Sequence, residues 1–433
     1  MIDRVLIDFE SAPFEIIDGD RGKNYPKQNE FSRFGHCLFL SARNVTPRGF
    51  EFSDCQFISE EKDQFLRKGK LRRGDVVLTT RGTIGNSAYY GDSVTYDHVR
   101  INSGMVILRC DAKQMLPTYL YHFLRSPSFH DQVNSLRSGV AQPQLPISDM
   151  KRIKLPLPPV TEQMCIGAIL SAYDELIENN LRRIKILEEM AQNLYREWFV
   201  KLRFPGHENA RFLDSPLGKI PEGWKPRTLD DVLSELESGS RPKGGIDPGV
   251  RDVPSIGAEN ILGLGQYDYS KEKYVSREFF GRMRRGHIKS GDVLLYKDGA
   301  KIGRKSMFRD GFPHPECCIN EHVFILRTNK GCTQSYLFFW LDQPDMTERI
   351  RTLNSNAAQP GINQRGVKGL PIVLPPSTIL RTFDQAVEPL LAELFNLAKK
   401  NPILRRTRDL LLPKLISGEL DVRDLDIEAG NQI

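Results

Sequence analysis

Apolar residues recur every three or four positions along residues 161–204, a stretch dense in good helix formers. The apolar positions are Ile166, Leu170, Tyr173, Ile177, Ile184, Leu187, Ala191, Leu194 and Trp198, and Asn180 interrupts them. A repeat of about 3.5 residues is typical of a helix packed lengthwise against another helix. At about 1.5 Å per residue, the stretch predicts a rod roughly 60 Å long. A long core helix within one globular domain is the plainer alternative.

The sequence contains an internal duplication, which changes that picture. Segment 72–92 (RRGDVVLTTRGTIGNSAYYGD) returns at 289–311 (KSGDVLLYKDGAKIGRKSMFRDG), 101–109 (INSGMVILR) at 319–327 (INEHVFILR), 117–127 at 333–344, and 137–159 at 354–376. Three pairs share one offset of 217 residues: Asp75 and Asp292, Tyr119 and Tyr336, and Gln142 and Gln359. One offset shared by so many landmarks predicts two copies of one domain.

The long helix is duplicated as well. A second apolar stripe follows the second copy and consists of Phe383, Val387, Leu390, Leu394, Leu397 and Leu404. Pro389 fits this stripe only at some cost, because proline removes a backbone hydrogen bond from a helix. Pro402 and Pro413 should kink or end the helix. We therefore expect a broken second helix that frays after about Ser417.

Within each copy the pattern predicts a mixed α+β domain. VVLTT, SAYY and MVILRC are β-rich runs, with copies at VLLYK, KSMF and HVFILRT, while YLYHFLRS and YLFFWLD indicate short buried helices. The predicted organisation is a first domain at 1–160, a central helix at 161–204, a linker at 205–219, a second domain at 220–376, a C-terminal helix at 377–420 kinked near 401–402, and a flexible tail at 421–433.

Composition narrows the class of protein. The 433 residues suffice for two or three domains, and the net charge of +6 permits binding to nucleic acid without requiring it. The seven Cys lack CxxC pairs, which favours reduced thiols over the alternative of a zinc site. No apolar run approaches 18 residues and the N-terminus lacks a signal layout, so we expect a cytoplasmic protein without a membrane segment.

Catalytic motifs are missing from the sequence. There is no phosphate-binding GxxxxGK[ST] loop, no adenine clamp of an amino-methyltransferase, no nuclease metal cluster and no HExxH. The eight His are scattered, and each fits a structural role better than a ligand role. This absence argues against catalysis by the chain, although some active sites carry no local signature.

Basic loop residues are the chemistry that the sequence does offer. Residues 277–309 carry ten Lys or Arg against three acids, with aromatic residues interleaved. Lys and Arg neutralise phosphates, and forked side chains read base edges. The matching turn at 79–86 keeps the glycines but changes the projecting side chains, as expected of two modules that read two different sequences. The alternative is a charged hairpin that is merely solvated.

The ordered set of motifs resembles the specificity (S) subunit of a type I restriction-modification system. It comprises LPLPPVTEQ (155–163), LYREWFVKLRFPG (194–206), IPEGW (220–224) and RDLLLPKLISGELDV (408–422), together with the duplicated GDVxL…GxIG and AQP elements. The resemblance covers essentially the full length. It implies two target recognition domains, pseudo-two-fold related, that each read one half of a split asymmetric DNA site. They are separated by two long antiparallel coiled-coil helices that fix the gap.

The resemblance also implies partners. These are double-stranded DNA, two modification subunits that carry S-adenosylmethionine, and restriction subunits that use ATP and Mg, so the chain itself would hold no cofactor, no metal and no catalytic residue. Loop position suggests DNA contacts at Arg43, Asn44, Arg81, Thr83, Asn86, Asn260, Lys297, Lys301, Arg304 and Lys305. Trp198, Phe199 and Leu202 would form a docking surface for the modification subunits, or pack against the adjacent domain instead.

Two other functions stay open at this point. One is an enzyme, namely the recognition part of another methyltransferase or nuclease assembly. The other is a coiled-coil scaffold without DNA contact. Asn180 fits a polar residue that sets the register of the helix pair, or an exposed asparagine.

Overall fold

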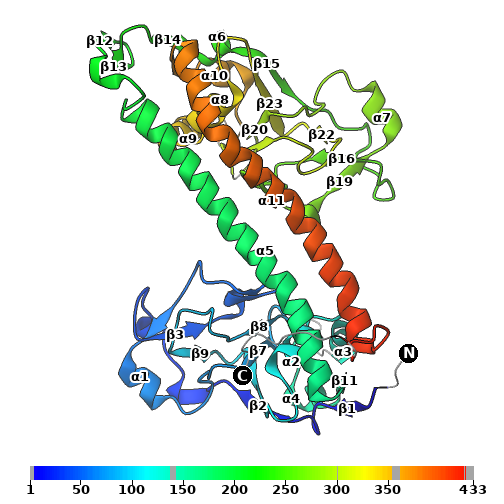
Figure 1. The fold of residues 1–433 in the computed structure, drawn as a ribbon. Helices are drawn as coiled ribbons and strands as arrows, with labels where there is room; N and C mark the ends of the chain where they lie inside the picture. Colours follow the sequence, from blue (N-terminus) through cyan, green and yellow to red (C-terminus); the bar gives the residue numbers. More distant parts are fainter. Residues whose placement is uncertain (1–3, 137–142, 300, 354–360, 424, 426–433) are drawn as a thin grey trace. The chain divides into compact units, whose positions relative to one another are not determined.

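The chain forms two compact units that share its two long helices. The computed structural model describes residues 4–136, 143–299, 301–353, 361–423 and 425 (Figure 1). Unit 1 comprises residues 1–176 and 404–433, and unit 2 comprises residues 177–403. Each unit therefore contains one copy of the duplicated domain and part of both long helices.

Unit 1 is built on an antiparallel sheet in the order β2-β10-β7-β8. Its strands are β2 (Phe14–Asp18), β10 (Met105–Cys110), β7 (Val76–Thr79) and β8 (Ser87–Tyr89). A second sheet contains β6 (Phe57–Ile58), β3 (Cys37–Leu40) and β9 (Val99–Ile101), with β3 and β9 parallel. The remaining elements are the pairs β1 (Leu6–Asp8) with β11 (Lys154–Pro156) and β4 (Val45–Thr46) with β5 (Gly49–Phe50), and helices α1 (Glu60–Phe65), α2 (Pro117–Phe123), α3 (Pro127–Leu136) and α4 (Ile147–Met150).

Unit 2 repeats this topology, which confirms the duplication. Its antiparallel sheet has the order β15-β23-β20-β21, from β15 (Leu233–Ser238), β23 (Val323–Thr328), β20 (Asp292–Tyr296) and β21 (Lys305–Phe308). Its second sheet contains β19 (Lys273–Val275), β16 (Val253–Ile256) and β22 (Cys318–Ile319), again with one parallel pair. The unit is completed by two strand pairs, β14 (Lys225–Thr228) with β24 (Pro371–Leu374) and β17 (Ile261–Gly263) with β18 (Gln266–Tyr267). It also contains helices α6 (Leu229–Val232), α7 (Arg277–Arg282), α8 (Gln334–Leu341), α9 (Pro344–Thr352) and α10 (Gln364–Lys368).

The predicted linker at 205–219 is more ordered than a linker. It includes β12 (Phe212–Ser215) and most of a hairpin with β13 (Gly218–Pro221). Phe204, just before the segment, and Trp224, after β13, pack together with a ring-centroid distance of 5.2 Å. The cluster lies on either side of the connector, whose own residues are exposed or half-buried.

One duplicated pair of residues, Asp75 and Asp292, makes the same contacts in each unit and anchors its sheet. Arg109 donates two hydrogen bonds to Asp75, from Nε at 2.8 Å and from Nη2 at 2.7 Å. Arg327 grips Asp292 in the same way, with both distances at 2.6 Å. Paired donors on one carboxylate fix geometry as well as charge. The repeated Gly-Asp-Val element is thus kept because it holds the central strand against its neighbour.

The two long helices are α5 (Val160–Tyr195) and α11 (Ser377–Ser417), and a π turn at Arg196–Val200 follows α5. The predicted stripe is buried in the cores of the units. Ile166 and Leu170 belong to the core of unit 1, and Ile184 and Ala191 to that of unit 2. The described residues contain no helix that is long and apolar enough to cross a membrane.

Contacts within unit 2 show that the helices run antiparallel. Asn180 of α5 meets Asn401 of α11, whereas Tyr195, farther along α5, meets Phe383 near the start of α11. Arg183 Nη2 also lies 2.6 Å from Glu393 Oε1. The coiled-coil pairing expected from the 3.5-residue repeat is therefore confirmed.

The expected break at Pro402 is wrong. Helix α11 is continuous from Ser377 to Ser417, although Pro389, Pro402 and Pro413 all lie inside it. An interior proline costs a helix about 3 kcal/mol. Around Pro402 this cost is offset by burial, since Leu397, Ala398 and Asn401 are almost fully buried. The degree of bending near 401–402 stays a prediction, while the end of the helix at Ser417 is as expected.

The Asn180–Asn401 pair should set the register of the helix pair. Asn180 Nδ2 donates to Asn401 Oδ1 at 3.0 Å, and the two residues are only 7% and 3% exposed. Leaving one buried amide without its partner costs about 1–3 kcal/mol. We expect N180L and N401L each to lower the free energy of unfolding of unit 2 by that amount, and the double variant to recover most of it. Denaturant unfolding followed by tryptophan fluorescence measures this.

The matched control for the asparagine pair is N179L, because Asn179 is the exposed neighbour of Asn180. It should leave stability unchanged within about 0.5 kcal/mol. Additive losses in the double variant would contradict a pairwise contact.

Acid should weaken unit 1 through His122 on α2. This ring is buried, lies 3.1 Å from Ser171 Oγ of α5, and burial lowers its pKa to about 3. Between the unfolded pKa of about 6.5 and the folded value, only the unfolded state binds the proton, so stability falls as pH falls, by about 1.4 kcal/mol per pH unit. We expect a loss of about 2 kcal/mol from pH 6.5 to 5.

Hydrogen exchange over α2, corrected for the intrinsic effect of pH, measures the acid response. H122Q should flatten it, whereas H98Q, at an exposed histidine of the same unit, should not. Equal responses in the wild type and H122Q would exclude His122 as the cause.

Candidate nucleic-acid interface

In unit 1, three loops meet around the turn between β7 and β8, residues 80–86. The backbone N–H of Arg81 donates to Gly104 O at 3.1 Å, Thr83 Oγ1 donates to Ala42 O at 3.3 Å, and Asn86 Nδ2 donates to Val45 O at 3.0 Å. The turn needs Gly82 and Gly85, whose φ angles of +73° and +89° favour glycine. Arg81 and Thr83 remain exposed on this platform.

Unit 2 gathers the matching loops around the turn between β20 and β21. The backbone N–H of Lys297 donates to His322 O at 3.1 Å, and Arg304 Nη1 donates to Ile261 O at 3.0 Å. His322 Nδ1 lies 3.2 Å from Asp298 Oδ2. The same three loops thus meet in both units, but they carry different side chains.

Asn44 and Asn260, predicted to contact DNA, are buried loop organisers instead. Asn44 donates to Glu51 O and Asp54 O, both at 2.9 Å, and accepts from the backbone N–H of Ser41 at 2.9 Å. Asn260 likewise donates to Asp268 O at 3.0 Å and accepts from Gly257 N–H at 2.9 Å. They are 2% and 1% exposed, so this geometry argues against direct base contact by either side chain.

Lys305 is also removed from the surface. It is 8% exposed, and its Nζ donates to Leu341 O at 2.8 Å and to Thr347 Oγ1 at 2.6 Å. Burial lowers the pKa of Lys305, while the nearby carboxylate of Asp342 opposes this effect. The side chain ties β21 to α8 and α9, and it is not available to DNA.

The other residues predicted to contact DNA differ in exposure and in ion pairing. Arg81 and Lys301 are exposed and make no ion pair with described residues, and Arg43 is 84% exposed with Asp54 at 3.7 Å. Lys297 is held near Asp298 at 3.1 Å and over the ring of Phe324 at 5.2 Å. Arg43, Arg81, Thr83 and Lys301 are therefore the predicted residues best placed to reach a ligand.

The basic run at 277–309 does not form one surface. Arg277 pairs with Glu316 and Arg309 with Glu388, and Lys305 is buried. Phe279 and Phe280 pack on a small core instead of standing free for bases. The number of basic residues in the sequence of this segment is therefore larger than the number whose charge is exposed and unpaired.

Unit 2 also contains a polar cleft of about 100 Å³ that was not predicted from the sequence. Its walls are Ser240, Arg241, Pro242, Ile246, Ser255, Glu259, Lys273, Asn320, Glu321 and His322. Glu321 replaces Ser103, and His322 replaces Gly104, in the duplicated segments INSG and INEH. Comparing the two copies residue by residue for changed loop positions could have found them.

The aromatic residues expected to dock partners pack inside unit 2. Phe199 lies 4.9 Å from both Tyr336 and Phe383, measured between ring centroids. Trp198 lies 5.8 Å from Phe383, and Leu202 joins the cluster of Phe204 and Trp224. These three residues therefore pack against the adjacent domain, which is the alternative given above. A role in binding a partner subunit stays a prediction.

One group among the described residues could hold a metal, namely His36, Asp63 and His98. The carboxylate of Asp63 is already neutralised, because Lys70 Nζ and Arg100 Nε each lie 2.5 Å from it. The two imidazoles are stacked with centroids 4.2 Å apart, so their in-plane lone pairs do not converge. We assign no metal to this group.

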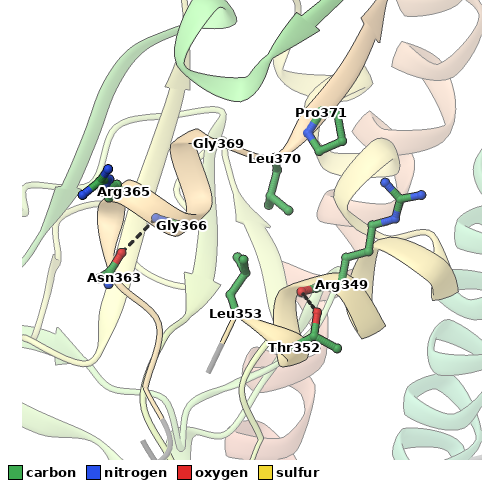
Figure 2. A pocket seen from close by; sticks show the side chains of 9 residues that line it. All are labelled: Arg349, Thr352, Leu353, Asn363, Arg365, Gly366, Gly369, Leu370 and Pro371. Atoms are coloured by element: carbon green, nitrogen blue, oxygen red, sulfur yellow. Dashed lines mark hydrogen bonds between the residues drawn. The ribbon is translucent and has the colours of Figure 1, made fainter. Parts of the chain in front are cut away.

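Figure 2 shows a second hollow of unit 2, bordered by α9, α10 and the start of β24. Two of its polar side chains bond locally, since Thr352 Oγ1 donates to Arg349 O at 2.7 Å and Asn363 Oδ1 accepts from Gly366 N–H at 2.8 Å. The residues after Leu353, 354–360, lie outside the described part of the chain, as do the predicted AQP landmarks 141–142 and 358–360. We assign no ligand to this hollow.

The chain is similar to proteins of known family. Residues 14–189 and 221–396 each match the type I restriction modification DNA specificity domain. The MjaIX specificity subunit of Methanocaldococcus jannaschii is 26% identical over 398 residues, 88% of this chain and 87% of that protein. The HindI specificity subunit of Haemophilus influenzae is 22% identical over 456 residues, 93% of this chain and 98% of that protein.

A solved structure supports the fold. The S subunit of a type I restriction-modification system from M. genitalium matches with a TM-score of 0.59 and 16% identity over 96% of both chains. The two family matches fall on the two copies of the duplicated domain and together cover most of the sequence. The chain therefore belongs to the type I restriction-modification DNA specificity family.

Proposed function

We propose that the chain reads a bipartite, asymmetric DNA site, one half with each recognition domain, and catalyses no reaction itself. The observation that carries this proposal is a conserved loop frame with substituted side chains. The equivalent asparagines Asn44 and Asn260 make the same bonds, and the residues before them are Arg43 and Glu259. A basic side chain in one domain is thus an acidic one in the other.

The turn between the central strands repeats this reversal of charge. Leu145 N–H donates to Thr80 O at 3.0 Å, and Ile362 N–H donates to Lys297 O at 2.9 Å, which makes Thr80 and Lys297 equivalent. The next residues are therefore equivalent as well, and they are Arg81 and Asp298. Folding explains the common frame. The acids of unit 2 also make local ion pairs, Glu259 with Lys273 at 2.8 Å and Asp298 with Lys297 at 3.1 Å, but the shared frame itself does not require opposite charges at these positions.

Opposite charges suit opposite base edges. Arginine donates two hydrogen bonds to the O6 and N7 acceptors of guanine, whereas a carboxylate accepts from the N4 amino group of cytosine. Arg43 and Arg81 in unit 1 therefore favour acceptor edges, while Glu259, Asp298 and Glu321 in unit 2 can accept from donor edges. Two modules with different preferences would read two different half-sites, and the whole site would be asymmetric.

The chemistry would then lie on partner subunits. We propose that modification subunits supply S-adenosylmethionine and methylate the DNA, and that restriction subunits use ATP and Mg. Helices α5 and α11 each run from one unit into the other, so they are the elements that could set the gap between half-sites. A cytoplasmic location stays the expectation from the sequence.

Substitutions at the two turns should alter different halves of the site. With the modification subunit in a host, R81A should relax the half read by unit 1, and D298N the half read by unit 2, because one paired base contact is worth about 1–3 kcal/mol of discrimination. Sequencing of methylated positions across the host genome measures both motifs.

The control for these variants is K113A, an exposed cation beyond the opposite end of β10. It should leave the motif unchanged. A variant that altered both halves together, or neither, would count against separate reading. Methylation by the chain alone would favour an enzyme, and a complex without any DNA preference would favour a scaffold.

A further inference from the structure

One exposed basic element is the same in both recognition domains. It follows the first strand of each four-stranded sheet, as Gly19-Asp20-Arg21-Gly22-Lys23 after β2 and Gly239-Ser240-Arg241-Pro242-Lys243 after β15. The offset here is 220, so the repeat at 217 does not align these segments. The strand register aligns the two segments instead. Asp18 pairs with Val106 and Ser238 pairs with Phe324, and Val106 and Phe324 are matching positions of the duplicated segments.

The element is mounted in a similar way in both units. A Cβ on Gly19 would lie 2.3 Å from Asn102 O, and one on Gly239 would lie 1.7 Å from Ile319 O, so only glycine allows the loop to approach so closely. The neighbouring turns match, since Asn102 Oδ1 accepts from Gly104 N–H and Asn320 Oδ1 accepts from His322 N–H, both at 2.9 Å. These turns carry Ser103 and Glu321, so the basic element adjoins the substituted loops.

Its cations are exposed, and two of them make only exposed ion pairs. The side chain of Arg21 is 51% exposed with Asp18 at 3.0 Å, and that of Arg241 is 55% exposed with Glu321 at 3.5 Å. Exposed ion pairs of this kind contribute about 0–1 kcal/mol and exchange readily. Lys23 and Lys243 are exposed and make no ion pair with described residues. Folding therefore gives no reason for keeping Arg and Lys at these positions.

We propose that Arg21 and Lys23, and likewise Arg241 and Lys243, bind the phosphodiester backbone of DNA at the two half-sites. The proposal rests on the proposed function and names a separate part of the interface. The backbone is the same at both half-sites, whereas the bases differ. The neighbouring residues have changed between copies, Asp20 to Ser240 and Gly22 to Pro242, but the two cations have not. Side chains that meet the same group can be the same in both domains.

The test measures DNA binding by the full chain assembled with its modification subunits. The variants are R21A/K23A and R241A/K243A, and the probes are a duplex carrying the methylated motif and an unrelated duplex of equal length. Each variant should lose about tenfold or more in affinity for both probes, and the slope of log K against log salt should fall by about 2. The methylated motif should not change.

Two further variants sharpen the test. R21K/K23R keeps the charges and should bind within about threefold of the wild type, because phosphate contacts depend mainly on charge. K113A removes a cation elsewhere on unit 1 and should leave the salt slope unchanged. Unaltered affinity and slope in the double alanine variants would overturn the assignment, and so would a changed motif, which would indicate base reading.

The outcomes separate this proposal from the proposed function. A wild-type complex that binds both probes equally would contradict sequence recognition itself. A wild-type complex that prefers its motif, combined with double alanine variants of unchanged salt slope, would contradict only the assignment of phosphate contacts.

Discussion

Burial of one apolar stripe along each long helix is the interaction on which both units depend. Ile166 and Leu170 of α5 complete the core of unit 1 together with Leu412 and Leu415 of α11. The later part of the stripe completes the core of unit 2, where α11 contributes a different set of residues. Neither recognition domain therefore has a core of its own that is independent of the helix pair. The helices are structural members of each domain as well as the connection between them.

A rigid frame with variable tips follows from this arrangement. The bidentate pairs Arg109–Asp75 and Arg327–Asp292 hold the central strands, and Asn44 and Asn260 hold the adjacent loops. The two carboxylates and the two asparagines are buried and hydrogen-bonded, so changing them would leave unpaired polar atoms. The substituted positions beside them are exposed or half-buried, so a change there carries a smaller penalty. Specificity can thus change without loss of the fold.

Much of the fold was predictable from the sequence, because it depends on periodicity and repetition. The 3.5-residue stripe identifies the helix pair, and the duplication identifies the two domains. The prediction of a helix break at Pro402 was wrong, because the rule that proline ends a helix ignores the burial of the neighbouring Leu397 and Ala398. Tertiary packing commonly overrides a local preference of this size.

The candidate site was less predictable, because residue type does not reveal side-chain direction. Lys305 and Asn44 are polar residues in loops or at strand ends, yet both point inward and bond to backbone carbonyls. The changed acids at 259, 298 and 321 could have been found by aligning the two copies and asking which loop positions reverse charge. The kept Arg and Lys after β2 and β15 could not, since they align only through strand register.

A structure of the assembled complex on its DNA would show whether each recognition domain reads its own half-site. We expect the turns at 80–86 and 297–304 each to face base edges, in two separated segments of the duplex. We also expect the side chains of Arg81 and Asp298 to contact different bases. DNA bound by one recognition domain only, or bound away from both turns, would contradict this expectation.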